Sequence, residues 1–356
     1  MRNKFTLLAV GDIFPANLGY HNGIGICGTF QKHNGSIWKD DMVNCLSKAD
    51  IAIANLEGPI IPDSNKAAKI SFAGCKEFIT FLKEVGIDIV SIANNHIMEQ
   101  GEQGFHYTID QLKKNKIHII GQAGINNNIV SYKVNDMTIA FASFNAITDN
   151  SIDEPLYQVF SEEVVLATLK DMQQFDFRVL SLHWGNEYMH IPSIDQINMA
   201  KKFIDNGANI IIGHHPHVIQ PVMEYNKGLV FFSLGNYLFD MIYRNNVRYG
   251  LISYITFYND KTIDYQIQGI KIQSNYSPKL VSQYQFNKYI TPIYDLFNKF
   301  MSYSDDKYNN EYLLMLKRKR LIQRCLMKLD MLRHLSHINR NDILQMRKRA
   351  LSLFNS

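Results

Sequence analysis

A strand, a loop and a helix follow one another repeatedly over the first 215 residues of the 356-residue chain. Each short, apolar, β-prone run is followed by a polar segment and then by apolar residues at helical spacing. This order predicts an α/β core in which strands and helices form layers. Two longer alternating runs, at 249–258 and 262–272, are expected to form either a second sheet or an antiparallel extension of the first.

The predicted elements divide the chain at Gly, Pro and Asn residues. The Gly- and Asn-rich segment 15–39 shows little periodicity, so we expect a long loop that could lie over a binding site. Strands are predicted at 5–10, 51–54, 88–93, 117–120, 130–134, 138–144, 178–182, 208–212 and 229–234, and helices at 41–48, 76–85, 105–115, 161–173 and 194–206.

Polar residues follow several of these strands directly. Three histidines lie within four residues after strand 208–212, in the segment I-I-I-G-H-H-P-H-V-I-Q at 210–220. Ligands of open α/β sheets bind beyond the carboxyl ends of the strands. Carboxylate, amide and imidazole groups suit Mn, Fe or Zn. Taken singly, each residue is equally well read as a loop cap, a turn former or a satisfied histidine. Together the strand ends supply Asp12, Glu57, Asn95, His183, His215 and His217.

Composition favours a protein that folds without covalent cross-links in a reducing compartment. The hydrophobic content is 46%, which is ample for a buried core. The four cysteines form no CxxC pair, so no disulfide framework or cysteine metal site is indicated. The apolar run at 5–10 is too short for a signal peptide, and no stretch is long enough to span a membrane. We therefore expect a soluble, cytoplasmic protein, or one peripheral at the inner membrane surface.

The carboxyl-terminal part differs from the rest in charge and in periodicity. Between Lys317 and Arg349 there are eleven Lys or Arg and two Asp, whereas 26 basic and 31 acidic residues lie elsewhere. Leucines and a cysteine recur every three or four residues on this basic helical segment. The stripe is expected to pack against the body, and docking to a partner or membrane surface is the alternative. It consists of Leu321, Cys325, Leu329, Leu332 and Leu335.

Six motifs in a fixed order resemble the CapA family of capsule and poly-gamma-glutamate biosynthesis, within the calcineurin-like metallophosphoesterase superfamily. They are G-D at 11–12, N-L-E at 55–57, A-N-N-H at 93–96, H-W-G-N-E-Y at 183–188, G-H-H-P-H-V-I-Q at 213–220 and S-L-G-N at 233–236. The resemblance covers residues 5–275 and implies an α/β, four-layer αββα sandwich of two mixed sheets. We therefore predict a CapA-like domain at 1–275 and a basic helical extension at 276–356.

The resemblance also implies roles for individual residues. Glu57 would bridge two divalent ions, with Asp12 and His217 on one ion and Asn95, His183 and His215 on the other. His96 would act as general acid toward the leaving oxygen. One or two ions, with Mn, Fe or Zn preferred, are expected. Substrate contacts are predicted for Asn55, Asn94, Glu187, Tyr188 and Asn236.

Three positions depart from the superfamily pattern. Phe14 replaces the histidine that usually follows the first aspartate, a loss shared by CapA-like proteins, so one ion would have one ligand fewer. Glu99 stands where an aspartate is common, which alters the reach of a carboxylate toward His96. His214 competes with His215 as a ligand, and a small residue at this position in relatives favours His215.

These features predict a metal-dependent hydrolase that acts on a phosphoester or related bond of a small molecule or polymer precursor. The alternative is a non-catalytic assembly component that keeps its metal and docks membrane-associated synthesis machinery through the basic tail. Nucleic-acid binding is not favoured, because the tail lacks aromatic residues interleaved with its basic ones beyond its first part.

Overall fold

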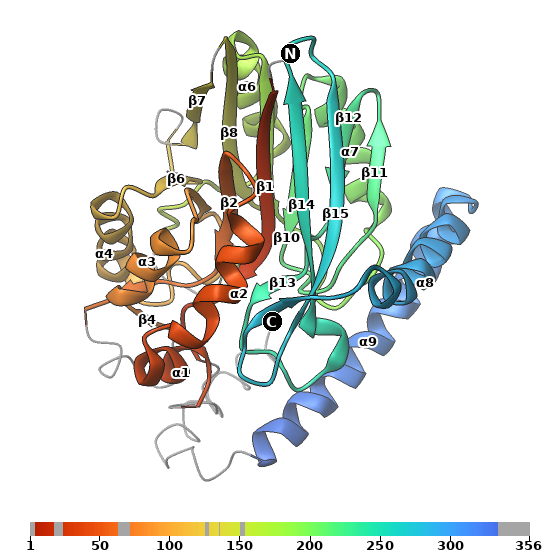
Figure 1. Ribbon diagram of the computed structural model, residues 1–356. Coiled ribbons are helices and arrows are strands. Elements are labelled where there is room, and N and C mark those ends of the chain that lie inside the picture. The colour runs from red at the N-terminus through yellow and green to blue at the C-terminus, as the bar shows by residue number, and fades with distance from the viewer. Residues whose placement is uncertain are drawn as a thin grey trace.

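Two sheets face each other at the centre of the protein, and helices cover their outer faces (Figure 1). The computed structural model describes residues 4–17, 24–62, 72–124, 128–134, 136–149 and 154–333. The first sheet has the order β16-β15-β14-β1-β2-β5-β6, and β13 pairs with β1 beyond Gly11. Its strands are β1 (Lys4–Ile13), β2 (Ile51–Leu56), β5 (Ile89–Ser91), β6 (His118–Ile120), β13 (Asn236–Leu238), β14 (Tyr249–Tyr258), β15 (Ile263–Ile272) and β16 (Pro278–Leu280).

The second sheet has the order β11-β12-β10-β9-β8-β7. In the second sheet the central strands are parallel and both edge strands are antiparallel, whereas in the first sheet β1, β2, β5 and β6 are parallel and β14, β15 and β16 pair antiparallel. Both sheets are therefore mixed. The long alternating strands β14 and β15 extend the first sheet beside β1. The strands of the second sheet are β7 (Val130–Val134), β8 (Met137–Asn145), β9 (Phe177–His183), β10 (Ile210–His214), β11 (Val222–Tyr225) and β12 (Gly228–Phe231). A separate two-stranded sheet is formed by β3 (Ile60–Ile61) and β4 (Gly74–Cys75).

Alternation along the strands assigns side chains to different layers. On β1, Leu8 and Val10 pack under the outer helices, whereas Leu7 and Ala9 face the second sheet. Successive strand side chains point to opposite faces, so one strand contributes to two cores. The predicted four-layer αββα sandwich is confirmed. The first sheet is covered by α1 (Ile26–His33), α2 (Ser36–Leu46), α3 (Lys76–Glu84) and α4 (Gly101–Lys114), and the second by α6 (Glu162–Asp171) and α7 (Ile194–Asp205).

The prediction of a long loop at 15–39 was wrong within the described residues, because α1 and the first turns of α2 occupy 26–39. Buried Phe30 and Trp38 anchor these helices, with their ring centroids 6.2 Å apart. Glycines at 25 and 35 precede the two helices and mask the apolar spacing in the sequence. Residues 18–23 of that segment lie outside the described part.

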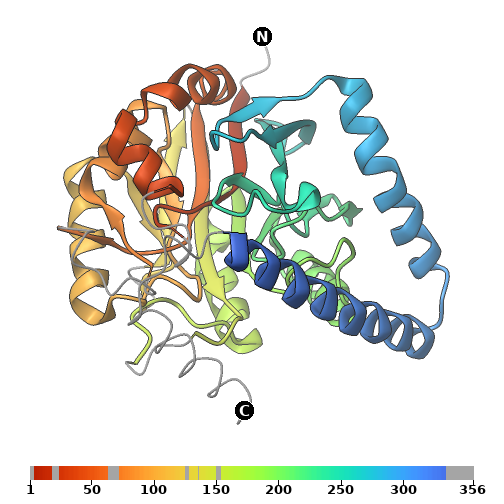
Figure 2. The same cartoon turned by 90° about the horizontal axis from the view of Figure 1, so that it is seen from below.

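Two further helices, α8 (Gln283–Met301) and α9 (Asp305–Arg333), follow the sheets. Seen from the edge where the parallel strands end, α9 crosses beside the loop at 241–248 (Figure 2). Tyr308 and Tyr312 of α9 pack into the core under α7. Together with Leu316 they are the apolar buried residues of α9, whose other buried residues are polar. No described helix is both long and apolar enough to cross a membrane.

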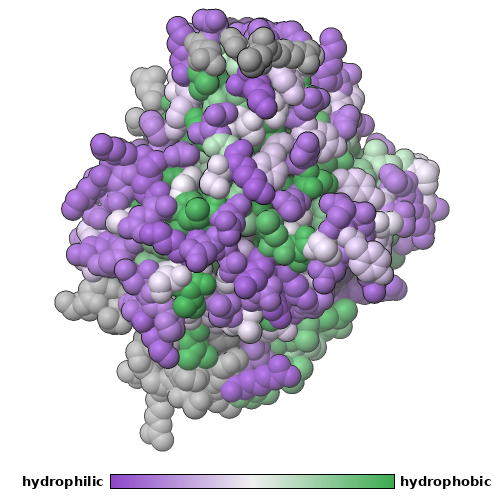
Figure 3. Space-filling view, in the orientation of Figure 1, coloured by the Kyte–Doolittle hydropathy of each residue, from purple (hydrophilic) through white to green (hydrophobic). Residues whose placement is uncertain are grey.

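The prediction that the leucine stripe packs against the body was also wrong. Leu321, Leu329 and Leu332 are 66%, 52% and 56% exposed, and Cys325 is exposed as well. The helix turns its tyrosines inward because they are larger and their hydroxyls find partners. Hydrophobic residues reach the surface in the lower right of Figure 3, where α9 lies. Leu335 lies outside the described residues.

Candidate metal centre

The carboxyl ends of β1, β2, β9 and β10 meet at one edge of the sandwich and bring the predicted ligands together. Parallel pairing sets this arrangement: Asp12 is in register with Asn55, and His214 with His183. Each of the six predicted ligands is buried, with exposed fractions between 0% and 8%. Burial of so many ionisable groups is costly unless they are paired or bind a metal ion.

Two close groups of possible ligands lie in this cluster. One contains Asp12, Glu57 and His183, and the other contains Glu187, His215 and His217, with the ligand atoms of each group within 4.8 Å of one another. The expected division placed His215 with Asn95 and His183. In the structure, the rings of His183 and His215 lie 4.9 Å apart, so the two groups adjoin.

Asp12 is held by two histidines. Its Oδ1 lies 2.8 Å from Nδ1 of His214, and its Oδ2 lies 3.4 Å from Nδ1 of His217. Burial alone would raise the pKa of Asp12, but the hydrogen bonds and charges of these rings outweigh it and lower that pKa well below the usual range. Asp12 is therefore a carboxylate, as a metal ligand must be.

Glu57 is the least satisfied group of the cluster. Its Oε1 is buried without a hydrogen-bond partner, and Nε2 of His217 lies 3.5 Å away. Burial raises the pKa of Glu57 well above its ordinary value. A buried carboxyl oxygen in this situation fits a bound cation, which would supply the missing charge.

His217 and His215 take opposite protonation preferences. Burial disfavours the charged form of His217, but Glu57 and Asp12 outweigh it and raise its pKa to about 10. For His215, burial dominates and lowers the pKa to about 4, although the charge of Glu187 opposes the shift. The buried Nδ1 of His215 has no hydrogen-bond partner. A neutral imidazole with a free buried nitrogen is a fitting metal ligand.

The loop after β10 holds both rings in an uncommon backbone conformation. The φ angles of His215 and His217 are +92° and +56°, and that of the neighbouring Tyr188 is +65°. Left-handed conformations of residues other than glycine cost about 1 to 3 kcal/mol and persist where the surrounding contacts enforce them. The hydrogen bond from Tyr188 N to Pro216 O, 2.8 Å long, joins the two strained segments.

Amide side chains support the ligands from behind. Nδ2 of Asn55 donates to Asp12 and Glu57, and Nδ2 of Asn94 donates to Oδ1 of Asn55 over 3.1 Å. Oδ1 of Asn236 lies 2.9 Å from Nδ1 of His217 and accepts its hydrogen, which leaves Nε2 turned toward Glu57. Three of the residues predicted to contact substrate thus bond internally and orient the ligands.

Asn95 and His183 form a close pair, with Asn95 Oδ1 2.9 Å from His183 Nε2. Burial lowers the pKa of His183 well below 6.5, so its ring is neutral. Two ligands on one ion are separated by about 3 Å when the bonds to the metal are near 2.1 Å. The donor set, the unpartnered Glu57 and His215 atoms and this spacing fit divalent metal ions.

His96 lies at the open edge of the cluster. Its Nδ1 is 3.3 Å from Oε1 of Glu99, so the longer carboxylate reaches the ring. Its Nε2 is 3.9 Å from Oε1 of Glu57, and 17% of its side chain is exposed. Phe72 packs edge-on against the ring at 4.9 Å. This placement directs Nε2 toward the ligands while the ring stays accessible.

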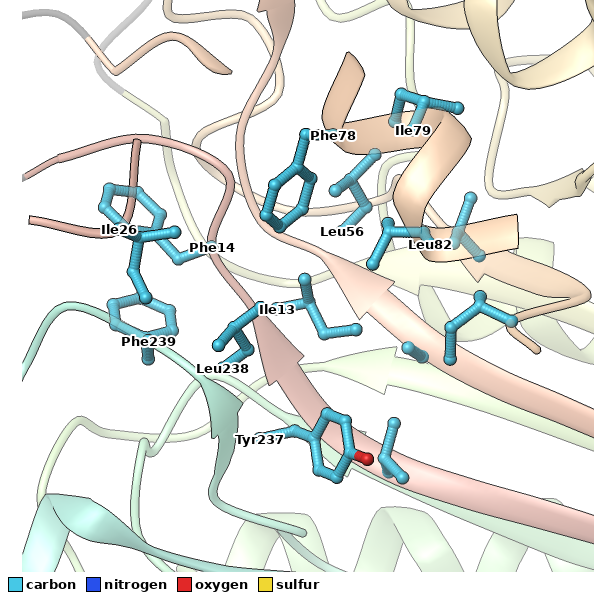
Figure 4. Close-up of a cluster of buried hydrophobic side chains, with 14 of the residues drawn as sticks. Ile13, Phe14, Ile26, Leu56, Phe78, Ile79, Leu82, Tyr237, Leu238 and Phe239 are labelled. Atoms are coloured by element: carbon cyan, nitrogen blue, oxygen red, sulfur yellow. The ribbon is translucent and has the colours of Figure 1, made fainter. Parts of the chain in front are cut away.

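Phe14 occupies an aromatic stack beside the centre. Its ring is buried and stacks on Phe239 at 4.7 Å (Figure 4), and Phe239 in turn contacts the ring of His217 at 4.7 Å. The residue that replaces the usual histidine therefore fills apolar space next to a ligand.

The structure gives one predicted residue another role and adds residues that the motifs had not indicated. Glu187, predicted as a substrate contact, is itself a possible ligand by its distance to His215 and His217. Arg244 lies over the ring of Tyr188, and its Nη1 donates to Gln323 of α9. The tail and the loop after β13 carry no motif of their own, so only their packing reveals these residues.

The fold is a metallophosphoesterase-like αββα sandwich, and carboxylates and histidines cluster at the ends of its strands. The profile of the family described as "Bacterial capsule synthesis protein PGA_cap" matches residues 6–241. The chain belongs to this family. The match ends before β14, β15 and the helices that follow.

Two relatives and one solved structure show how far the similarity extends. "Capsule biosynthesis protein CapA" of Bacillus anthracis is 32% identical over 227 residues, 59% of this chain and 55% of the relative. "PGA biosynthesis protein CapA" of Bacillus subtilis is 32% identical over 219 residues, 58% of this chain and 57% of the relative. This chain thus spans about half the length of these relatives. A phosphatase from Mycoplasma pneumoniae shares the fold, with a TM-score of 0.50, 13% identity and coverage of 82% of this chain and all of that one.

Proposed function

We propose that the chain is a metal-dependent hydrolase that cleaves a phosphoester or related bond during biosynthesis of a cell-surface polymer. The observation that carries the proposal is the convergence of two ligand groups around the unpartnered Glu57 Oε1 and His215 Nδ1. Family membership supports the link to capsule synthesis. The four cysteines, which form no CxxC pair, support a reducing, cytoplasmic location.

In this proposal the two groups would hold one or two divalent ions, with Mn, Fe or Zn preferred by the mixed carboxylate and imidazole donors. When bound, such ions supply Lewis-acid polarisation of a phosphoryl oxygen. Asp12, Glu57 and His183 would hold one ion, and Glu187, His215 and His217 the other, with Asn95 beside His183.

His96 would supply the proton for the leaving oxygen. With Nδ1–H donated to Glu99, a protonated ring carries its second proton on Nε2, which faces the ligands. General acid catalysis by a positioned side chain contributes about 10² to 10⁴-fold in rate. Glu99 acts through His96 and is a positioning residue.

The test is metal titration followed by an assay on an aryl phosphomonoester and an aryl phosphodiester with Mn²⁺. We expect turnover that needs the metal and that is lost in His215→Ala and in His96→Ala. His215→Ala should also weaken metal binding, whereas His96→Ala should keep it, since His96 belongs to neither ligand group. His106→Ala is the matched control, because that side chain is 58% exposed on α4. Absence of metal binding by the purified chain would refute the proposal.

The exposed stripe on α9 supports a second function, that of an assembly component that docks membrane-associated synthesis machinery. Leu321, Leu329 and Leu332 are more than half exposed, and exposed Lys317, Arg324 and Lys328 lie on the same helix. Tight metal binding without turnover would favour this function. So would loss of the surface polymer in cells carrying Leu321→Glu with Leu332→Glu, if cells carrying His96→Ala still made it.

A further inference from the structure

Three cationic side chains gather where α9 meets the loops around the metal centre. Arg320 Nη2 donates to Oδ1 of Asn186 over 3.1 Å, and Asn186 immediately precedes Glu187. Arg244 lies 5.9 Å from the ring centroid of Tyr188, whose ring lies 6.5 Å from that of His217. Burial lowers the pKa of the Lys319 ammonium group, and the positive charge of the nearby Arg244 lowers it further.

None of these three cations forms a salt bridge with a described residue. Lys319 and Arg244 are both partly buried, and the charge of Arg244 acts on Lys319 where α9 contacts the loop at 241–248. Like charges held together repel unless an anion lies between them or nearby. Glu187 and Asp330, which act on the neighbouring Tyr243, offset part of this charge, and the three cations still favour a further anionic group beside them.

Neutral contacts hold the cations at this place. Nη1 of Arg244 donates to Oε1 of Gln323 over 2.9 Å, and Gln323 Nε2 donates to the hydroxyl of Tyr243. Gln323 is one of the few polar residues of α9 that are buried. Asn186 Nδ2 donates to the hydroxyl of Tyr312 over 3.1 Å. Hydrogen bonds thus join α9 to the loop after β9 and to the loop at 241–248. Figure 2 shows α9 crossing this edge.

We propose that Arg244, Lys319 and Arg320 form an anion subsite beside the metal centre, which binds a carboxylate or phosphate group of the substrate next to the bond held at the metal ions. That the bound anion belongs to a substrate rests on the proposed function. All three residues lie beyond the family match at 6–241, and two of them are on α9. It would select substrates that carry a second negative group.

The test is direct binding of two probes, inorganic pyrophosphate and pentaglutamate, to the 356-residue chain freed of metal, at about 0.15 M salt, where long-range attraction is screened. We expect 1:1 binding of at least one probe. Lys319→Gln and Arg320→Gln should each raise its Kd about tenfold, the effect of one lost charge-assisted contact. Preference for pyrophosphate assigns phosphate to the subsite, and preference for pentaglutamate assigns carboxylate.

The matched controls are Lys317→Gln and Arg324→Gln, which remove the same charge from exposed positions of the same helix. They should change the Kd less than twofold. Arg320→Lys keeps a charge but not the fork toward Asn186, and it should retain most of the affinity. Equal losses in the controls, or no binding of either probe, would overturn the subsite. Failure of metal binding would sink the proposed function alone, because this measurement contains no metal.

Discussion

Oδ1 of Asp12 lies 2.8 Å from Nδ1 of His214, and this hydrogen bond joins the first strand of one sheet to the end of a strand in the other. Residues 202 positions apart in sequence thus fix the orientation of one carboxylate. His214 therefore orients a ligand, which explains a histidine at this position without giving it a metal ion.

Replacement of His214 by alanine is expected to weaken Mn²⁺ binding about ten- to a hundredfold, as loss of a ligand's hydrogen-bond partner does in other metal sites. His214→Asn places an amide nitrogen where Nδ1 lies and should recover most of the affinity. Isothermal titration with Mn²⁺ measures both. Unchanged affinity in His214→Ala would show that the bond does not position Asp12.

Glu57→Gln should separate metal binding from folding. The buried carboxyl oxygen of Glu57 has no hydrogen-bond partner, and burial raises the pKa of the group. Loss of its charge is expected to lower metal affinity more than about a hundredfold, since a directly bound ligand matters more than its supporting partner. The metal-free variant should melt at the same temperature as the wild type or higher, because a neutral amide costs less to bury than a carboxylate. A clearly lower Tm of the metal-free variant would contradict this account of Glu57.

His190 is expected to make folding sensitive to acid. It is partly buried between the loop at 241–248 and the segment after β10, with Nδ1 3.2 Å from Ile219 O. Burial, with the charges of Lys319 and Arg244, lowers its pKa to about 4. The folded state resists protonation, so the unfolded state binds more protons between pH 6.5 and pH 4. Stability is full above pH 6.5 and falls as the pH drops through that window.

The corresponding measurement is urea unfolding of wild type and His190→Gln at pH 7.5 and pH 4.5. The wild type should lose about 2 kcal/mol more than the variant over this interval. His106→Gln, on the exposed face of α4, should lose as much as the wild type. If the wild type and His190→Gln lost the same free energy of unfolding over this interval, His190 would not be the cause of the acid sensitivity.

Gly11 allows β1 to pass close to the segment before β13. A Cβ at this position would lie 1.9 Å from the carbonyl oxygen of Gly235, which also accepts the hydrogen bond from Asp12 N. Gly11→Ala is expected to cost about 3 kcal/mol or more, since backbone must move. Gly86, with φ +103° and no atom nearer than 3.7 Å to the added Cβ, meets only backbone strain, and its alanine variant should cost about 1 to 2 kcal/mol. Equal costs in urea unfolding would exclude the close approach as the cause.

Much of the fold followed from the sequence because its signals are local. The helix predicted at 76–85 is α3, and the hairpin predicted over 130–144 is formed by β7 and β8. Alternation and helical spacing depend on residues a few positions apart. Segment 15–39 failed because glycines and polar residues surround Phe30 and Trp38, and only the core that these two rings enter makes α1 and α2 stable.

The amphipathic stripe on α9 shows the limit of periodicity. Spacing marks leucines on one face, but it does not say which face finds a partner. Tyr308 and Tyr312 pack into the core in place of the leucines, and the hydroxyl of Tyr308 also donates a hydrogen bond to Pro192 O over 2.7 Å. The division of the chain at residue 275 stays a prediction, although Phe286 and Phe297 of α8 enter two of the cores.

The sequence by itself determined the class of fold and the residues that follow each strand, because both depend on the order of residue types along the chain. The tertiary structure decided which of these residues share an ion-sized space, how His214 holds Asp12, and that Arg244 and Arg320 contact Tyr188 and Asn186 beside the centre. Such contacts join segments far apart in sequence, and strand register and helix packing, rather than any local pattern, bring them together.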